Sequence, residues 1–366
     1  MNYEIRRSTK KDMNEAINEI SQEINSPKLI IFFCQYECFE ECSKKLKANF
    51  NNSVIIGSTT FAAFCKEGAY KDNIIALFIT DGIECYGDII ENADKYPLKS
   101  ISRIEKCVSK LRDTDNAICF EVSNAFISCE ELVLSVLNSV LKDKNIPLFG
   151  GTAGNSAKDD KNLIAFNGKV YLNASAFVII KNLTGRIKIY KENIYKPTNF
   201  HFTATKVDVE SRTVYEYDDK PAAEVMAHIL NTDINKLPNY FDNYPVGRII
   251  DKDIFITANN QISNKNGISY HARIYKNSSM VLLELDDYKA INDITVNKIK
   301  NDDIKPSLAI MINCLARSIL FEQNNYLTEF AKKIGNAVDN YIGFSGYGEQ
   351  YNQYHFNQTM VIAVFE

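Results

Sequence analysis

The sequence has no long uninterrupted apolar segment and no block of Lys or Arg residues. A transmembrane helix needs roughly 18 to 20 consecutive apolar residues, and no segment approaches that length. The first residues, MNYEIRRSTKKDM, also lack the apolar stretch of a secretory signal. The formal net charge of −4 gives no basic field that would attract phosphate backbones or anionic lipid. These absences argue against membrane insertion and nucleic-acid binding, and we expect a cytoplasmic protein.

The nine cysteines include no C-x2-C pair and no Cys/His group at the spacing of known metal sites. They are odd in number and mostly lie within apolar runs, which favours reduced, buried thiols over a disulfide framework. Cys34, Cys38 and Cys42 would lie on one face of a helix, where three thiolates could hold zinc or an iron–sulfur cluster. We expect them instead to be small core residues, and we expect no metal.

Three segments of the 366-residue chain repeat one order of predicted elements: helix, strand, helix, strand, Gly-containing loop, strand. The strands and loops read LIIFF, SVIIGSTT and IIALFI in the first copy, AICFEV, IPLFGGTAGN and SAFVII in the second, and SLAIMI, YIGFSGYGE and MVIAVF in the third. The intervening segments have apolar residues three and four positions apart, which is typical of helices packed on one face. We therefore predict three copies of one α/β unit.

This order of elements has a geometric consequence. Two strands joined through a helix are expected to be parallel with a right-handed crossover, and the third strand then returns antiparallel. The carboxyl ends of the first two strands open on one edge of the sheet, which is where α/β sheets bind ligands. Gly residues there could let backbone N–H groups approach a bound group and could supply positive φ where a turn needs it.

The stretch from 186 to 288 is different and β-rich. It contains the segments RIKIY, FHFTATKVDV, TVYEY, IIDKDIFITA, GISYHARIY and SMVLLELD, and a short helix PAAEVMAHIL that opens with Pro221. The predicted fold class is α/β, with mixed sheets, flanking helices, repeated units and a β-rich insert in the second half. We place a boundary near residue 190, which gives halves 1–190 and 191–366.

The chain's last motif carries a family resemblance. IGFSGYGEQ followed by HFNQTMVIAVF resembles the C-terminal signature of the FIST family (F-box and intracellular signal transduction), in which a G-x-x-x-Y-G-E loop precedes an N-Q-T strand. INCLARSILF is similar to the Cys-x-x-Arg element upstream of it, and PLFGGTAGN and SVIIGSTTFAAF are similar to elements of the family's N-terminal half. The resemblance spans nearly the whole chain, so we interpret 1–190 and 191–366 as the N- and C-terminal FIST halves.

The resemblance implies a sensory module that binds a small molecule such as an amino acid. Such modules are usually joined to a kinase, cyclase-type or chemoreceptor output domain; we expect this chain to signal through a separate partner protein. The first loop, GSTTFAAF, departs from the family pattern, which leaves a binding role for Thr59 open. The candidate ligand-binding residues are Gly151, Thr152, Asn313, Cys314, Arg317, Gly346, Tyr347, Gly348, Glu349, His355 and Asn357.

A zwitterionic ligand would need a cation for its carboxylate and an anion for its ammonium group, and Arg317 and Glu349 are the candidates for these roles. Arg317 could instead be a surface residue at a helix start. Asn357, Gln358 and Thr359 could bind the ligand, although we favour a structural role in which they satisfy the loop's own backbone.

Two alternative functions remain open from the sequence. In a Cys-dependent acyl-transfer enzyme, Cys314 would be the nucleophile, His355 the base, and Glu349 or Asn357 the orienting group. In a nitric oxide sensor, which the resemblance also allows, haem would need an axial ligand from His201, His228, His271 or His355, and His355 is the best candidate. His228 lies in an apolar helix and is predicted to be a core residue. We expect neither an enzyme nor a cofactor.

Overall fold

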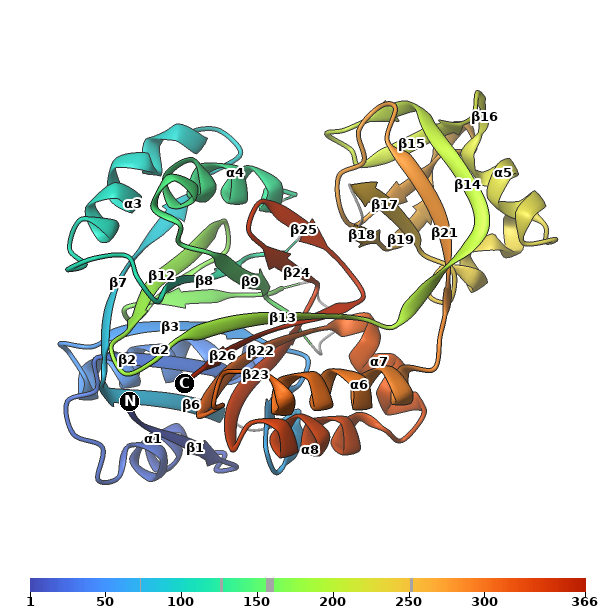
Figure 1. The fold of residues 1–366 in the computed structure, drawn as a ribbon. Helices are drawn as coiled ribbons and strands as arrows, with labels where there is room; N and C mark the ends of the chain where they lie inside the picture. Colours follow the sequence, from blue (N-terminus) through green and yellow to red (C-terminus); the bar gives the residue numbers. More distant parts are fainter. Residues whose placement is uncertain (73, 126–127, 156–160, 251–252) are drawn as a thin grey trace. The chain divides into compact units, whose positions relative to one another are not determined.

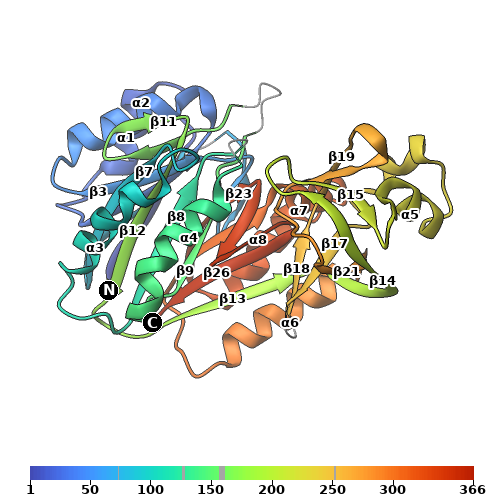
Figure 2. The ribbon, with the colours of Figure 1, turned by 90° about the horizontal axis from the view of Figure 1, so that it is seen from above.

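A computed structural model describes residues 1–72, 74–125, 128–155, 161–250 and 253–366. The chain divides into two compact units. The first unit comprises 1–191, 292–353 and 360–366, and the second comprises 192–291 and 354–359. The two termini lie close together in both views (Figure 1 and Figure 2), and both belong to the first unit.

The first unit contains three mixed sheets built on one plan. The first sheet has the order β1-β6-β2-β3-β10-β11, the second contains β24-β9-β8-β12-β7, and the third has the order β13-β26-β22-β23-β4-β5. The strands of the first sheet are β1 Asn2–Ser8, β2 Leu29–Cys34, β3 Val54–Thr59, β6 Ile74–Asp81, β10 Ile164–Phe166 and β11 Lys169–Tyr171. Those of the second are β7 Ile83–Glu91, β8 Ala117–Ser123, β9 Leu148–Thr152, β12 Ala174–Asn182 and β24 Gly348–Tyr351. Those of the third are β4 Ala63–Cys65, β5 Gly68–Tyr70, β13 Ile187–Asn193, β22 Leu308–Cys314, β23 Asn340–Gly346 and β26 Thr359–Phe365.

The strand directions confirm the predicted repeat. The first two strands of each copy are parallel, as β2 with β3, β8 with β9, and β22 with β23. The third strand of each copy, β6, β12 or β26, runs antiparallel to the first. Each sheet is therefore mixed, and the carboxyl ends of its two parallel strands meet at one edge.

The repeat also contains an exchange that the sequence pattern does not reveal. After its second strand, each copy extends an arm that pairs with the sheet of another copy. The arm β4–β5 of the first copy joins β23 of the third sheet, β10–β11 of the second joins β3 of the first sheet, and β24 of the third joins β9 of the second sheet. Each arm thus adds a strand beside the second parallel strand of another copy, and the three exchanges link the three sheets in a cycle.

Helices cover one face of each sheet. The helices are α1 Met13–Ser21 and α2 Tyr36–Asn49, α3 Ile101–Val108 and α4 Glu130–Leu141, and α6 Tyr288–Asn301, α7 Leu315–Gln323 and α8 Leu327–Ala337, with short 3₁₀ helices at Pro97–Ser100 and Lys142–Lys144. Their buried residues follow the predicted helical spacing, as at Ile104, Cys107 and Val108 of α3. Figure 1 shows α3 and α4 outside the strands of the second sheet. The opposite sheet faces meet in a shared core, where the rings of Phe33 and Phe344 lie 4.8 Å apart.

The glycines of the predicted loops lie within or at the ends of strands rather than in turns. Gly57 belongs to β3, and Gly150 and Gly151 belong to β9. Among the described glycines, a φ in the left-handed region occurs at Gly82 and Gly168 only, and neither belongs to the predicted loops, so the suggestion that the loop glycines supply positive φ is wrong. Close packing is what requires them, because a Cβ on Gly57 would lie 2.4 Å from the ring of Phe32.

The second unit is the predicted β-rich insert. Its sheet has the order β18-β17-β21-β14-β15-β20-β19, with β16 beside β15. The strands are β14 Tyr195–Asp208, β15 Thr213–Tyr217, β16 Lys220–Pro221, β17 Val246–Ile250, β18 Asp253–Thr257, β19 Asn259–Ile262, β20 Ile268–Tyr270 and β21 Ser279–Leu285, and β25 Tyr354–Phe356 belongs to the same unit. The helices are α5 Ala222–Ile229 and the 3₁₀ helices Ile234–Tyr240 and Asn264–Asn266. Within the predicted strand 249–258, residues 251–252 lie outside the described residues.

The α/β fold class is confirmed by these mixed sheets and flanking helices. The halves 1–190 and 191–366 are divisions of the sequence, whereas the two units are divisions by contact, so the halves stay a prediction. No helix in the described part of the chain has the length and apolar character needed to cross a membrane.

Candidate functional site

The ends of the parallel strands from all three copies are joined by hydrogen bonds. The backbone N–H of Phe61 donates to Ser345 O at 3.2 Å, and that of Ser345 donates to Thr60 Oγ1 at 2.9 Å. The N–H of Gly154 donates to Thr59 O at 3.0 Å, and the N–H of Tyr347 donates to Thr152 O, also at 3.0 Å. We call residues 57–62, 150–155 and 345–349 the strand-end junction. It assembles the polar strand ends that the repeat predicted.

A buried polar chain leads from β22 into this junction. Asn313 Nδ2 donates to Ser318 Oγ at 2.8 Å, and the hydroxyl groups of Ser318 and Ser345 lie 2.7 Å apart. All three side chains are fully buried. Asn313 Oδ1 accepts no hydrogen bond from the residues described. One acceptor at the end of this chain is therefore open to a donor.

Arg317 and Glu349 are both fully buried in the first unit, with no exposed side-chain surface. Arg317 lies on α7, where its guanidinium carbon is 5.3 Å from the ring centroid of Phe321 and 5.7 Å from that of Phe330. Glu349 lies on β24, and β24 is in contact with β22, the strand that leads into α7. The sequence left open a surface position for Arg317, and the burial rules that position out.

Four further candidates, Gly151, Thr152, Gly346 and Gly348, lie near Glu349 at the junction. Gly151 pairs with Glu349 and Thr152 with Gly348 across the β9–β24 ladder. A Cβ on Gly151 would lie 2.6 Å from Ile312 Cγ2. The same addition at Gly346 would place the Cβ 2.1 Å from Thr152 O.

Those glycines are therefore required by close packing at the junction. Cys314 caps the amino end of α7 and is 3% exposed. Its role as a nucleophile stays a prediction.

His355 and Asn357 belong to the second unit. Asn357 Oδ1 accepts from the N–H of Ala258 at 3.2 Å, and its own N–H donates to Ile256 O at 3.1 Å. These bonds tie Asn357 to the backbone of Ala258 and Ile256 rather than to that of its own loop, and its role in ligand binding stays a prediction. The carbonyl of His355 accepts from Arg248 Nη2 at 2.9 Å, and its side chain is 2% exposed. Haem binding through His355 stays a prediction.

The sequence predicted that His228 and the three clustered cysteines are buried core residues, and the structure shows how far each of them is buried. His228 is exposed, so the prediction that it is a core residue is wrong, because it lies on the outer face of α5. Cys34 is the last residue of β2, so the prediction that it shares one helical face with Cys38 and Cys42 of α2 is wrong. Cys34 and Cys42 are buried in the core, and Cys38 is partly buried. Within the described ranges, no three His, Cys, Asp or Glu side chains are grouped so as to hold a metal ion.

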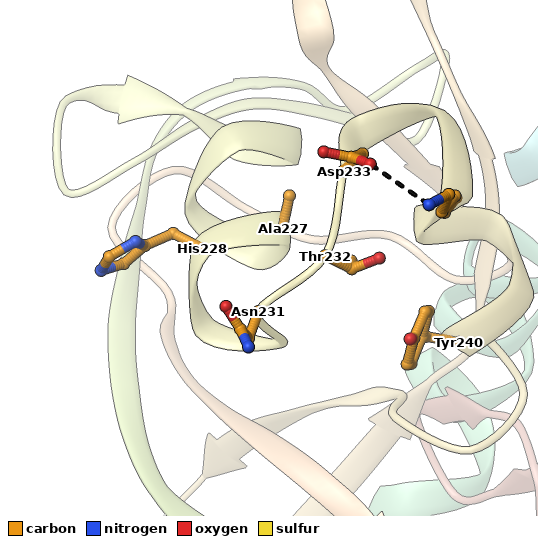
Figure 3. A pocket seen from close by; sticks show the side chains of 7 residues that line it. Ala227, His228, Asn231, Thr232, Asp233 and Tyr240 are labelled. Atoms are coloured by element: carbon orange, nitrogen blue, oxygen red, sulfur yellow. Dashed lines mark ion pairs between the residues drawn. The ribbon is translucent and has the colours of Figure 1, made fainter.

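The second unit has a surface hollow of about 440 Å³ beside α5 (Figure 3). It is lined by Ala227, His228, Asn231, Thr232, Asp233, Lys236 and Tyr240. An ion pair of 3.4 Å joins Lys236 Nζ to Asp233 Oδ2, with both side chains well exposed. In Figure 3 the His228 side chain points away from Thr232 and Tyr240. None of the candidate ligand-binding residues lines this open, polar hollow, although His228 is one of the four histidines considered as a haem ligand.

Sequence reasoning missed a buried carboxyl group, that of Glu121 on β8. Its side chain has no exposed surface, and burial raises its pKa to about 8, with a contribution from the negative charge of Glu130. The hydroxyl groups of Ser123 and Ser175 donate to Glu121 Oε1 and partly oppose this shift. A charged residue inside the apolar run AICFEV was the signal that could have found it.

Comparison with known proteins places this architecture in a class of signalling modules. The FIST N domain profile matches residues 28–220, and the FIST C domain profile matches residues 222–352. The chain belongs to the FIST family, whose domains are sensor domains of signal transduction. It is also 25% identical, over 405 aligned positions, to an uncharacterized protein of Methanocaldococcus jannaschii. That alignment covers 97% of this chain and 77% of the relative.

Proposed function

We propose that the chain is a cytoplasmic sensory module that binds a small zwitterionic molecule, such as an amino acid, at the strand-end junction. Its signal then passes to a separate protein, such as a kinase or cyclase-type output. Membership of the FIST family supports the signalling role. The binding role is supported by one observation above all, which is that Arg317 and Glu349 are both fully buried on elements that lead into the junction.

Burial of charged side chains is the reason this observation matters. Moving a charge out of water costs several kcal/mol per ion, so proteins retain buried charges mainly where partners or function require them. Arg317 offers planar, forked donors for a carboxylate, and Glu349 offers an acceptor for an ammonium group. The open acceptor Asn313 Oδ1 adds a further contact for a donor of the ligand.

Thermal unfolding against a panel of amino acids and metabolites tests the proposal. A ligand present at 100 times its Kd stabilises the folded state by about 2.7 kcal/mol, which raises the Tm. We expect Arg317→Met and Glu349→Gln each to weaken binding at least tenfold, and the double variant Arg317→Met/Glu349→Gln to abolish it. Arg112→Met, which removes an exposed Arg of the same unit, is the control and should bind as the wild type does.

The outcome that contradicts the proposal is equally clear. If no compound raises the Tm of the wild type, or if the single and double variants that retain a cooperative transition bind as tightly as the wild type, the junction is not the binding site.

A further inference from the structure

A second cluster of polar side chains is buried on the helix-facing side of the second sheet. It consists of Glu121, Ser123, Thr152, Ser175 and Gln350, none more than 1% exposed, and we call it the Glu121 cluster. The strand register places Ser175, Ser123 and Thr152 in one row across β12, β8 and β9. Glu121 and Gln350 lie in the next row, on either side of Gly150. All five side chains therefore point to the same face.

This face is covered by helices. Phe177, which pairs with Glu121 on the neighbouring strand, belongs to the core cluster that includes the buried residues of α3 and α4. Gly150 and Gly348 are the positions that would otherwise project side chains among Glu121, Thr152 and Gln350. The absence of side chains at these two positions leaves the polar groups of the cluster facing one another.

Several atoms of the cluster lack hydrogen-bond partners. Glu121 Oε2, Thr152 Oγ1, Gln350 Oε1 and Gln350 Nε2 are all buried, and none has a partner among the residues described. Leaving a buried polar atom unpaired costs about 1 to 3 kcal/mol, so native structures rarely leave several together. Four such atoms on three neighbouring side chains indicate that a group outside the described residues satisfies them.

The fold itself does not require polar residues at these positions. In the first sheet the residue equivalent to Glu121 is Phe32, which also faces a Gly, and the arm residue equivalent to Gln350 is Ala165. In the third sheet the corresponding residues are Met311 and Phe64. The polar pair is therefore particular to the second sheet, although the backbone plan is common to all three.

The charge of the cluster indicates what it would bind. No salt bridge joins Glu121 to a basic side chain in the described part of the chain, and the nearby Glu130 adds negative charge. Ser123 and Ser175 both donate to Oε1, an arrangement that favours the ionised carboxylate and leaves Oε2 free to accept. A cation beside Oε2 would stabilise the ionised carboxylate further.

We propose that the Glu121 cluster binds the ammonium group of a small primary amine. An ammonium group has three N–H donors, and Glu121 Oε2, Thr152 Oγ1 and Gln350 Oε1 provide three oxygen acceptors. Thr152 belongs to the strand-end junction as well, but the cluster lies on the opposite face of the second sheet from Glu349, because Glu349 and Gln350 are consecutive strand residues and project to opposite faces of β24. The inference therefore stands without the function proposed above.

Methylammonium chloride is the probe for this site. At a pH above the Glu121 pKa of about 8, a concentration series at constant ionic strength should raise the Tm of the wild type in proportion to the logarithm of concentration. Potassium chloride and tetramethylammonium chloride, which have no N–H donors, should leave the Tm unchanged. An equal shift with potassium would overturn the assignment of an N–H donor, and no shift with methylammonium would indicate that water fills the cluster.

Two variants locate the effect. Glu121→Gln keeps the oxygen that accepts from both serines but removes the charge, and we expect it to weaken methylammonium binding at least 100-fold. Thr152→Val should weaken it about tenfold, which is the expected effect of losing one hydrogen bond to a charged group. Thr257→Val is the matched control, because Thr257 is a buried threonine of the second unit whose hydroxyl group also has no partner among the described residues, and it should bind methylammonium as the wild type does.

If Glu121→Gln and Thr152→Val bind as the wild type does, the amine binds elsewhere and the inference is wrong. The test is also independent of the amino-acid panel. A methylammonium shift without any amino-acid hit would retain this site and remove the function proposed for the junction.

Discussion

The first and second sheets have the same backbone plan but treat their buried strand ends differently. At the end of β3, Thr59 Oγ1 accepts from the N–H of Leu163 at 3.0 Å. At the end of β9, Thr152 Oγ1 has no hydrogen-bond partner among the described residues. Two residues further into the neighbouring strands, Phe32 stacks on Phe39 with ring centroids 5.2 Å apart, whereas Glu121 holds a carboxyl group.

This difference separates the residues that the common backbone arrangement requires from those that a binding site would require. The first sheet shows that this backbone arrangement forms with an apolar residue at the position of Glu121 and with a threonine hydroxyl that is bonded to the backbone, although Ser58 Oγ of β3 has no partner among the described residues. The amine site proposed above predicts that the polar residues of the second sheet lower stability in the absence of a ligand, as residues retained for function often do. Substitutions that exchange the chemistry of the two sheets test this interpretation directly.

The largest effect is expected when the carboxyl group is placed in the first sheet. Phe32→Glu removes a buried ring and introduces a charge where Cys34 and Ile74 stand in place of Ser123 and Ser175. The loss of the ring and the unsatisfied carboxyl group together should cost at least about 4 kcal/mol in the free energy of unfolding. Urea unfolding measures this loss, and Phe32→Leu, expected to cost about 1.5 kcal/mol or less, is the control. A loss below that of Phe32→Leu would show that the serines are not needed to bury a carboxyl group.

The pH dependence of stability gives the next largest effect. Burial raises the pKa of Glu121 from its ordinary value of 4.5 to about 8, so between these values the folded state retains a proton that the unfolded state has released. Stability should therefore fall as the pH rises through this window, by up to about 1.4 kcal/mol per pH unit.

The comparison with Glu121→Gln isolates this contribution. Between pH 6 and pH 8, the unfolding free energy of the wild type should fall relative to that of Glu121→Gln by about 2 to 3 kcal/mol. This is the upper limit for one carboxyl group with these two pKa values. Glu130 and Cys119 face the same region and remain in both proteins. A difference that stays constant with pH would show that Glu121 is already ionised in the folded protein below pH 6.

The repeat and its strand directions could be predicted because they follow from local patterns. Apolar runs of strand length, alternating with helical spacing, fix the type and order of elements such as β2, α2 and β3. Right-handed connection then fixes the parallel pairs. The exchange of arms could not be predicted. A three-residue strand such as β4 pairs with a strand almost 280 residues away, and its short sequence does not identify that strand as its partner.

The candidate site was predictable only in part, for a related reason. The strand-end residues were found because their positions follow from the order of elements. Glu121 was missed because its neighbours in the cluster, Ser175 and Gln350, come from strands far apart in the sequence. The loop glycines were found, but their close approach to Ile312 and Thr152 depends on packing between copies.

The smallest effect distinguishes the two threonines by stability alone. Thr59→Val removes a hydroxyl group that bonds to the backbone of Leu163 and leaves that N–H unsatisfied, which should cost about 1 to 2 kcal/mol. Thr152→Val removes a hydroxyl group without a partner and adds a methyl group of similar size, so without ligand its stability should equal or slightly exceed that of the wild type. Urea unfolding of both variants, in buffer free of amines, measures the difference. Equal losses in the two variants would mean that Thr152 Oγ1 is satisfied in solution by bound water, and the contrast between the sheets would then rest on Glu121 and Gln350 alone.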